Sequence, residues 1–302
     1  MLGLLDEFKE PASKLGLELI QVDMVQTLSE AELIVLLPGF DGWIIGDDPA
    51  TEAVFSSTVG GRFQAAVKWG IGVDNVDFNA CERLGIPITN TPNMFGDEVA
   101  DLAVGYLIAL ARQTFEIDRG VREGSWPKPA GKSITGKNVG VVGFGDIGKS
   151  VVKRLSGFDV KVTVFDPGVE GNLGFDFVSR EVFPNGLERL DFLIFTCALN
   201  KKNFHMLDAV SLARLKNGCS VINVARGALI DEAALIDSLI RGTVASAALD
   251  VFEVEPLPMN SKVRELENCI LGSHNGSNTK EAVRRASLEA LKKMEGFLYE
   301  RT

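Results

Sequence analysis

The sequence is poor in the residues that staple small secreted domains or bind transition metals. Its 302 residues include four cysteines, at positions 81, 197, 219 and 269, which are far apart, lie in apolar surroundings and form no C-x-x-C pair. Four such cysteines in a chain this long do not predict a disulfide framework. The histidines number two, His205 and His274. A clustered zinc site is therefore not expected, and no metal is needed to explain the sequence.

Positive charge and long apolar runs are scarce as well. Lys and Arg number 31 against 41 Asp and Glu, which gives a net charge of −10 at pH 7. This balance lacks the basic footprint that nucleic acid or an anionic membrane attracts. No run approaches the roughly 18 apolar residues that span a bilayer, and the N-terminus has acids where a signal peptide needs basic residues. We expect a cytoplasmic protein that binds neither nucleic acid nor membrane.

What is present indicates a globular α/β protein with room for two domains. Hydrophobic residues make up 46% and charged residues 24% of the chain. Apolar runs alternate with helical stretches, which is typical of a parallel sheet. Strands are expected at 17–22, 33–37, 43–45, 66–69, 87–89, 160–165, 192–197, 219–223, 245–248 and 269–271. Helices are expected at 99–112, apolar on most faces and buried between domains or subunits, and at 279–299, which is amphipathic.

Residues 138–166 hold a strand, a glycine-rich turn, a helix, a second strand and a terminal acid. Gly143, Gly145 and Gly148 give G-x-G-x-x-G, in which the glycines permit a tight turn, close approach of a pyrophosphate and close helix–strand packing. The helix near Asp146 points free N–H groups at the phosphates. Asp166, about 20 residues on, can hydrogen-bond a ribose 2′-hydroxyl and repels a 2′-phosphate, which favours NAD over NADP.

Three polar islands follow later strands. Arg226 comes directly after one expected strand, Asp250 and Glu255 after the next, and His274 after the last. Because the carboxyl ends of parallel strands share one edge of a sheet, we expect an arginine, a carboxylate and an imidazole to converge there.

Several motifs together resemble the D-isomer-specific 2-hydroxyacid dehydrogenases. They are the glycine fingerprint, N-V-A-R-G-A-L-I-D-E-A-A-L from 223, A-L-D-V-F-E-V-E-P from 248, S-H-N-G-S-N-T-K-E-A from 273, K-W-G-I-G-V-D-N-V-D from 68, N-T-P-N from 90 and V-A-D from 99. The resemblance runs from about residue 15 and is strongest to phosphoglycerate dehydrogenase-like and glyoxylate/hydroxypyruvate reductase-like members.

The resemblance implies two doubly wound parallel-sheet domains in a homodimer. A Rossmann NAD-binding domain (93–273) would be inserted in a smaller flavodoxin-like substrate domain (1–92), to which a C-terminal helix (274–302) returns, with hinges near 90–93 and 272–277. A substrate would meet NAD in the cleft between them. The strand that opens most family members has no counterpart here, so either the start is truncated or the first sheet is incomplete.

The resemblance also implies roles in hydride transfer between NAD and C2 of a small D-2-hydroxy or 2-oxo acid. Arg226 would bind the substrate carboxylate and carbonyl oxygen, His274 would act as general acid and base, and Glu255 would orient the imidazole and favour its protonated form. The cofactor site would comprise Gly143, Phe144, Gly145, Asp146, Ile147, Asp166, Pro167, Cys197, Ala198, Val224, Ala225, Arg226, Asp250 and His274. The substrate site would comprise Ile71, Gly72, Arg226 and, more speculatively, Lys68 for a phosphate or second carboxylate.

Other interpretations stay open. Asp166 can be a plain turn residue before Pro167, Arg226 a surface ion-pair residue, and the 70–74 loop an ordinary turn. The glycine turn also occurs in methyltransferases, and the C-terminal-binding-protein corepressors keep this fold and these residues as NAD sensors.

The chain departs from the family at Asp101, where Glu is more frequent, and at 197–200, where C-A-L-N replaces C-P-L-T. We assign His205 to structure.

Overall fold

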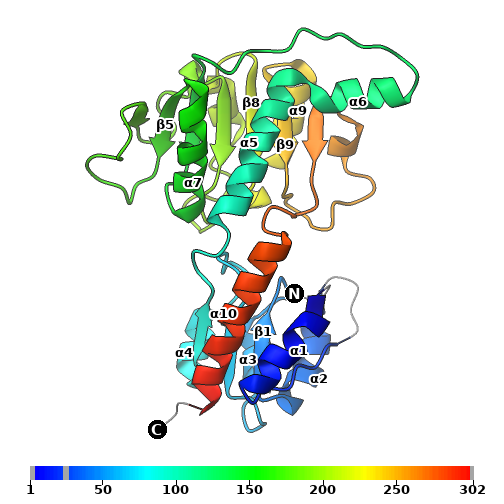
Figure 1. Ribbon diagram of the computed structural model, residues 1–302, viewed down its shortest axis with the longest axis vertical. Helices are drawn as coiled ribbons and strands as arrows, with labels where there is room; N and C mark the ends of the chain where they lie inside the picture. The colour runs from blue at the N-terminus through cyan, green and yellow to red at the C-terminus, as the bar shows by residue number, and fades with distance from the viewer. Residues whose placement is uncertain (1–3, 23–26, 300–302) are drawn as a thin grey trace. The chain divides into compact units, whose positions relative to one another are not determined.

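The computed structural model describes residues 4–22 and 27–299, which fold as two units (Figure 1). The smaller unit combines the chain up to Phe95 with the segment from Asn278 onward, and the larger unit is Gly96–Ser277. The larger unit is thus inserted in the smaller one, and its borders fall a few residues beyond those expected after 92 and 273. The expected α/β class with two parallel sheets is confirmed.

The larger unit is built on a seven-stranded sheet in the order β10-β9-β8-β7-β4-β5-β6, in which every pairing is parallel. The central strands are apolar and buried, as strands covered on both faces must be. The strands are β4 (Asn138–Val142), β5 (Lys161–Phe165), β6 (Val178–Arg180), β7 (Phe192–Phe195), β8 (Cys219–Asn223), β9 (Val244–Leu249) and β10 (Cys269–Leu271). All but the short β6 were expected from the sequence.

The helices of this unit are α5 (Gly96–Arg112), α6 (Thr114–Arg122), α7 (Asp146–Leu155), α8 (Ala209–Arg214) and α9 (Glu232–Arg241), with 3₁₀ turns η3 (Ser156–Phe158), η4 (Leu187–Arg189), η5 (Gly227–Leu229) and η6 (Lys262–Glu265). The apolar α5 packs on α7, β8 and β9 of its own unit. Asp101 on α5 accepts a 2.5 Å hydrogen bond from Arg154 Nε on α7. The family departure at Asp101 is therefore compatible with a helix–helix ion pair.

The smaller unit has a three-stranded parallel sheet, β1-β2-β3, among its described residues. Helix α10 packs on β1 and β2, and Trp69 Nε1 donates a 3.2 Å hydrogen bond to Ser287 Oγ on it. The elements are α1 (Leu5–Lys14), α2 (Glu30–Leu36), η2 (Leu37–Gly39), β1 (Gly42–Ile45), α3 (Glu52–Ser57), β2 (Ala65–Lys68), α4 (Phe78–Leu84), β3 (Ile88–Asn90) and α10 (Lys280–Tyr299).

The strand expected at 33–37 is wrong, because this segment belongs to α2 and η2. Ser29 and Glu32 form a capping box, in which each side chain accepts a hydrogen bond from the other residue's backbone N–H. Such a box fixes a helix start. Leu33 and Leu37, one helical turn apart, are buried while Val35 between them is 83% exposed. Helical capping thus overrides the strand preference of an apolar run.

The strand expected at 17–22 is also wrong within the described residues. The segment has no regular secondary structure, and although its exposure alternates over 17–20, it enters no ladder with a described strand. Leu17 and Leu19 instead pack beside Phe8 of α1 and Leu291 of α10. Apolar contact with helices, rather than strand pairing, holds this segment.

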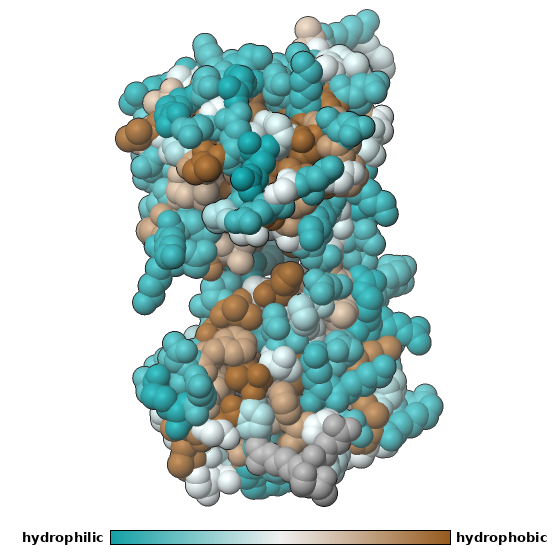
Figure 2. Space-filling model, turned by 90° about the vertical axis from the view of Figure 1, so that its left-hand side faces the viewer, coloured by the Kyte–Doolittle hydropathy of each residue, from teal (hydrophilic) through white to brown (hydrophobic). Residues whose placement is uncertain are grey.

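Figure 2 shows hydrophilic residues over most of the visible face of the larger unit. Among the described residues, no helix has both the length and the hydropathy required to cross a membrane.

Candidate functional site

The glycine-rich turn between β4 and α7 leaves no room for side chains at two of its three glycines. A Cβ on Gly143, whose φ is 96°, would lie 2.7 Å from Cys197 Cα. A Cβ on Gly148 would collide with the Gly143 carbonyl group. At Gly145, no described atom beyond its chain neighbours lies within 4 Å of that position. Open space beside the first N–H groups of a helix is what a pyrophosphate requires.

Thr196 fixes this turn and was missed by the sequence analysis. Its nearly buried hydroxyl lies 3.0 Å from the carbonyl oxygens of both Val142 and Gly143. The next residue, Cys197, is held against Gly143, and burial raises the pKa of its thiol to about 11. The thiol therefore stays neutral near pH 7 and lines the turn without acting as a nucleophile.

Asp166, directly after β5, forms the local turn of one interpretation given above and also contacts the glycine loop. Its Oδ1 accepts a 2.8 Å hydrogen bond from the Gly168 N–H, which is a local turn. Its Oδ2 accepts a 2.7 Å hydrogen bond from the Phe144 N–H, which ties it to the glycine loop. A carboxylate has about four acceptor sites, so capacity remains for ribose hydroxyls.

Asp146, the first residue of α7, directs its carboxylate toward the start of α5. A Cβ on Gly96 would lie 2.7 Å from Asp146 Oδ2. The backbone of Asp146, rather than its side chain, is then the part suited to a phosphate. Ile147 follows it, half-buried, in the first turn of α7.

Arg226 lies in the loop after β8, which a buried amide holds in shape. Asn223 Nδ2 donates a 2.9 Å hydrogen bond to the Arg226 carbonyl, and Asn223 Oδ1 accepts one of 3.0 Å from the Ala225 N–H. The half-buried Arg226 guanidinium donates to the Ala225 carbonyl through Nη1 at 2.8 Å. A guanidinium has five N–H donors in a planar fork, which is the geometry that binds a carboxylate. Asn223 is a positioning group that sequence reasoning did not single out.

Asp250 holds the loop that carries His274. Its carboxylate is buried, at 2% exposure, and accepts hydrogen bonds from the Asn275 N–H at 3.1 Å and the Gly276 N–H at 2.8 Å. Its carbonyl accepts the His274 N–H at 2.7 Å. Burial and the Asp250 charge raise the pKa of nearby Tyr106 to about 12, so this phenol stays protonated. Asp250 therefore anchors the His274 loop, a role additional to the cofactor contact that the family resemblance implies.

His274 and Glu255 meet as the sequence analysis predicted. His274 Nδ1 lies 2.7 Å from Glu255 Oε2, while Glu255 Oε1 accepts a 2.9 Å hydrogen bond from the Phe252 N–H. The carboxylate is thus fixed by the backbone and fixes the imidazole in turn. An imidazole held through Nδ1 presents Nε2 for proton exchange with a substrate.

The loops after β8, β9 and β10 contact one another directly. A Cβ on Gly227, beside Arg226, would collide with the backbone of Phe252 in the Glu255 loop. Asp250 joins this second loop to the His274 loop. Three adjacent parallel strands therefore bring the loops of Arg226, Glu255 and His274 together at one sheet edge.

The loop after β2, in the smaller unit, offers free backbone donors. Gly70, with φ of 127°, donates its N–H to Thr91 Oγ1 at 2.8 Å, and Asn90 Nδ2 lies 3.4 Å from the Ile71 carbonyl. Within the described ranges, neither the Ile71 N–H nor the Gly72 N–H donates a hydrogen bond. Two adjacent unpaired N–H groups suit a carboxylate.

Lys68 is placed differently from what the sequence suggested. Its side chain is 3% exposed, and its ammonium group donates to the Gly46 carbonyl and lies 3.5 Å from Asp47 Oδ1. The group thus ties the end of β2 to the loop after β1 within its own unit. Because its donors face chain partners, we do not retain Lys68 as a phosphate ligand.

Comparison with known proteins agrees with this arrangement. Residues 104–276 match the model of the D-isomer specific 2-hydroxyacid dehydrogenase NAD binding domain. The chain is 34% identical to a hydroxypyruvate reductase of Thermotoga maritima over 88% of each protein. It is 36% identical to a glyoxylate reductase of Thermococcus litoralis over 73% of this chain and 70% of that one. The TT0316 protein of Thermus thermophilus superposes with a TM-score of 0.88 at 28% identity, over 99% of this chain and 94% of that structure.

The family match spans more than half of the chain and falls on the unit that holds the glycine turn, Arg226, Glu255 and His274. The likeness to the hydroxypyruvate reductase covers 88% of this chain and therefore extends into the smaller unit. The chain belongs to the D-isomer-specific 2-hydroxyacid dehydrogenase family and is an oxidoreductase with an NAD-binding domain.

Proposed function

We propose that the protein is an NADH-dependent reductase of small, unphosphorylated 2-oxo acids of the glyoxylate and hydroxypyruvate class. The product is the 2-hydroxy acid, in the D configuration where C2 becomes a stereocentre. The 2.7 Å contact between His274 and Glu255 is the observation that carries the proposal. Relatives named hydroxypyruvate reductase and glyoxylate reductase support the substrate class. The burial of Lys68 argues against a phosphorylated substrate.

The described residues fit a nicotinamide dinucleotide. Open space at Gly145 and the exposed α7 N-terminus suit its pyrophosphate, and Asp166 suits its adenosine ribose. When bound, the cofactor supplies or accepts the hydride. Arg226 binds the substrate carboxylate and polarises the 2-oxo group through a charge-assisted fork. His274 donates a proton to the carbonyl oxygen, and Glu255 stabilises the imidazolium that precedes the transfer.

The proposal is tested by following NADH oxidation with glyoxylate, hydroxypyruvate, pyruvate and bulkier 2-oxo acids, beside NAD reduction with 3-phosphoglycerate. We expect turnover with the first two and little with 3-phosphoglycerate. A preference for 3-phosphoglycerate would overturn the substrate class, and no turnover with any of them would overturn the reductase assignment. The corepressor interpretation gains no support from the named relatives, which are reductases.

Asp166 is the expected selector of NADH over NADPH. Its charge opposes a 2′-phosphate by about 1–4 kcal/mol at a separation near 4 Å. In Asp166→Asn, which keeps one carboxamide oxygen for the local turn, we expect the ratio of kcat/KM for NADH to that for NADPH to fall about tenfold or more. Steady-state kinetics with both cofactors measure this ratio, and an unchanged ratio would contradict the ribose role.

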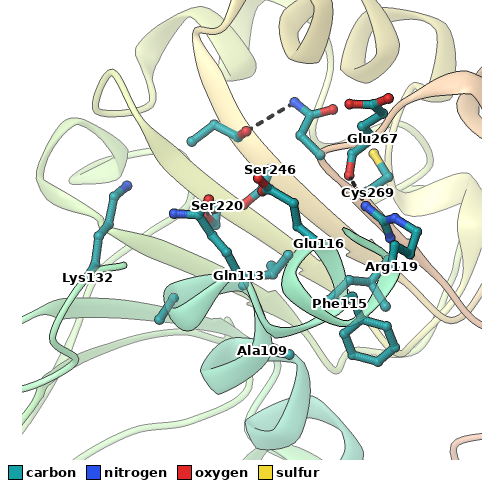
Figure 3. Close-up of a pocket in the computed structure, with 15 residues that line it drawn as sticks. Ala109, Gln113, Phe115, Glu116, Arg119, Lys132, Ser220, Ser246, Glu267 and Cys269 are labelled. Carbon is teal, nitrogen blue, oxygen red and sulfur yellow. Dashed lines mark hydrogen bonds between the residues drawn. The ribbon is translucent and has the colours of Figure 1, made fainter. Parts of the chain in front are cut away.

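We further propose that the protein is a homodimer that uses α6 and the segment after it. No residue of α6 is buried, although a free nine-residue helix is marginal in water. Phe115 and Val121 on α6 and the following Trp126 are exposed, Trp126 at 76%. A cavity of about 230 Å³ opens beside α6, lined by Phe115, Arg119 and the amino ends of β8 and β9 (Figure 3). A second copy would cover these groups.

For the dimer, we expect Trp126→Asp to give a monomer, because a buried charge would face the partner's apolar surface. Sedimentation velocity measures the change. Val210→Asp on α8 is the matched control, since Val210 is an equally solvent-exposed apolar residue of the same unit. If the Trp126 variant sediments as the wild type does, this surface is not the interface.

A further inference from the structure

A second histidine–carboxylate pair lies beside the loop that carries Glu255. His205 Nε2 is 2.9 Å from Glu253 Oε1, and both side chains are about one-third exposed. The Nε2 atom itself is buried, and it meets the carboxylate off the ideal hydrogen-bond direction. The His205 ring is stacked on Phe204, with centroids 4.0 Å apart.

A third element closes the cluster. The Glu232 N–H at the start of α9 donates a 2.9 Å hydrogen bond to Glu253 Oε1, and the Glu253 N–H returns one of 3.3 Å to Glu232 Oε2. Burial raises the pKa of the Glu232 carboxyl, and the neighbouring Glu253 carboxylate raises it further. The two acids repel each other when both are charged, and the His205 imidazole lies beside this pair.

The cluster joins the loops that follow three adjacent strands. His205 comes from the loop after β7, Glu232 from the segment after β8, and Glu253 from the loop after β9. The His205 N–H also donates a 2.8 Å hydrogen bond to the Ala228 carbonyl, two residues from Arg226. The loop of Glu255 is thereby tied to the loop of Arg226.

Polar contacts hold both acids of the loop that carries Glu255. Val254, between Glu253 and Glu255, is 60% exposed, and the nearest core anchor before it is the buried Phe252. Glu253 on one side reaches His205, and Glu255 on the other reaches His274. Two histidine–carboxylate pairs, His205–Glu253 and His274–Glu255, therefore hold the same short loop at positions two residues apart.

We propose that His205 is a positioning residue of the reaction: through Glu253 it fixes the loop that holds Glu255 against His274. The proposal rests on the function proposed above, in which His274 exchanges the substrate proton. In the sequence analysis we assigned His205 a purely structural role, and this proposal replaces that assignment. His274 alone exchanges the proton with the substrate. His205 contacts neither His274 nor the reacting atoms.

The spectroscopic test uses the fact that the sequence holds two histidines. His205→Ala and His205→Gln both leave His274 as the single imidazole, so its proton NMR signals are unambiguous in the whole protein. Both substitutions meet the same positive φ of 49° at this position, so the difference between them reports the side chain rather than the backbone. A carboxylate-bound imidazole N–H exchanges slowly with water and resonates downfield. We expect this signal in the wild type and in His205→Gln, whose amide nitrogen can replace Nε2, and its weakening or loss in His205→Ala.

The kinetic test is a double-mutant cycle with Glu255→Gln. We expect His205→Ala to lower kcat about tenfold, as loss of alignment does, while His205→Gln restores most of it. In the Glu255→Gln background, His205→Ala should cost less than about twofold if the two residues act in series. Glu253→Gln should reproduce His205→Ala, and thermal melting checks that each variant is folded.

Equal losses from His205→Ala in both backgrounds, or an unchanged His274 signal in that variant, would overturn the proposal. The failure of the proposed function is a separate result. A wild-type protein that reduces no 2-oxo acid would refute the reductase, whereas the NMR comparison would still decide whether His205 positions His274.

Discussion

Replacing His274 with Asn is expected to lower kcat for 2-oxo acid reduction by about 10²–10⁴-fold, the usual contribution of general acid catalysis. Asn is chosen because His274 has a positive φ of 55°, a conformation that Asn tolerates and Ala does not. The amide cannot exchange a proton at Nε2. Steady-state kinetics measure the loss, and NADH fluorescence titration should show that cofactor binding persists.

The pH dependence of the rate is a second test of the proton-transfer role of His274. In the wild type, reduction needs the protonated imidazole, so its rate should fall as rising pH removes that proton, and the rate of oxidation should rise instead. In the Asn variant, neither the fall of the reduction rate nor the rise of the oxidation rate with pH should be seen. Glu255→Gln is the matched control, with a smaller loss, because it removes a partner of the imidazole and leaves the acid itself. Unchanged turnover in the Asn variant would assign the proton to another group.

The sequence predicted best those features that depend on short, regular spacing. The glycine turn, the strand 219–223 and the strand 269–271 follow from apolar runs bounded by turn residues, and the structure has them at the same residues or nearly so. The convergence of a carboxylate and an imidazole followed from one rule, that parallel strands end at a shared edge. The family resemblance indicated that Glu255 is the carboxylate that pairs with His274. The seven-stranded parallel sheet provides that edge.

The features that the sequence concealed depend on side-chain direction or on capping. The run 33–37 has the composition of a strand, but Ser29 and Glu32 start a helix there. Lys68 is the last residue of a strand, and the sequence did not predict that its ammonium group would donate a hydrogen bond to the Gly46 carbonyl. The buried Asn223 supports the Arg226 loop through its side chain, a contact that has no sequence signature of its own.

For Arg226→Ala, we expect kcat/KM for glyoxylate or hydroxypyruvate to fall by about 10²–10⁴-fold. A fork to a carboxylate makes two charge-assisted hydrogen bonds, each worth about 1.5–3 kcal/mol. Both parameters should change, since KM rises with the loss of carboxylate binding and kcat falls with the loss of carbonyl polarisation. Initial rates over a range of substrate concentrations separate the two.

Two comparisons distinguish a lost guanidinium from a damaged loop. Added guanidinium ion should restore part of the Arg226→Ala activity, because the Asn223 side chain holds this loop through backbone groups that the substitution keeps. Arg226→Lys should recover little, since a point charge does not replace a planar fork. Full activity in Arg226→Lys would mean that charge alone suffices, and wild-type kinetics in Arg226→Ala would place the substrate carboxylate elsewhere, for instance on the free N–H groups of Ile71 and Gly72 alone.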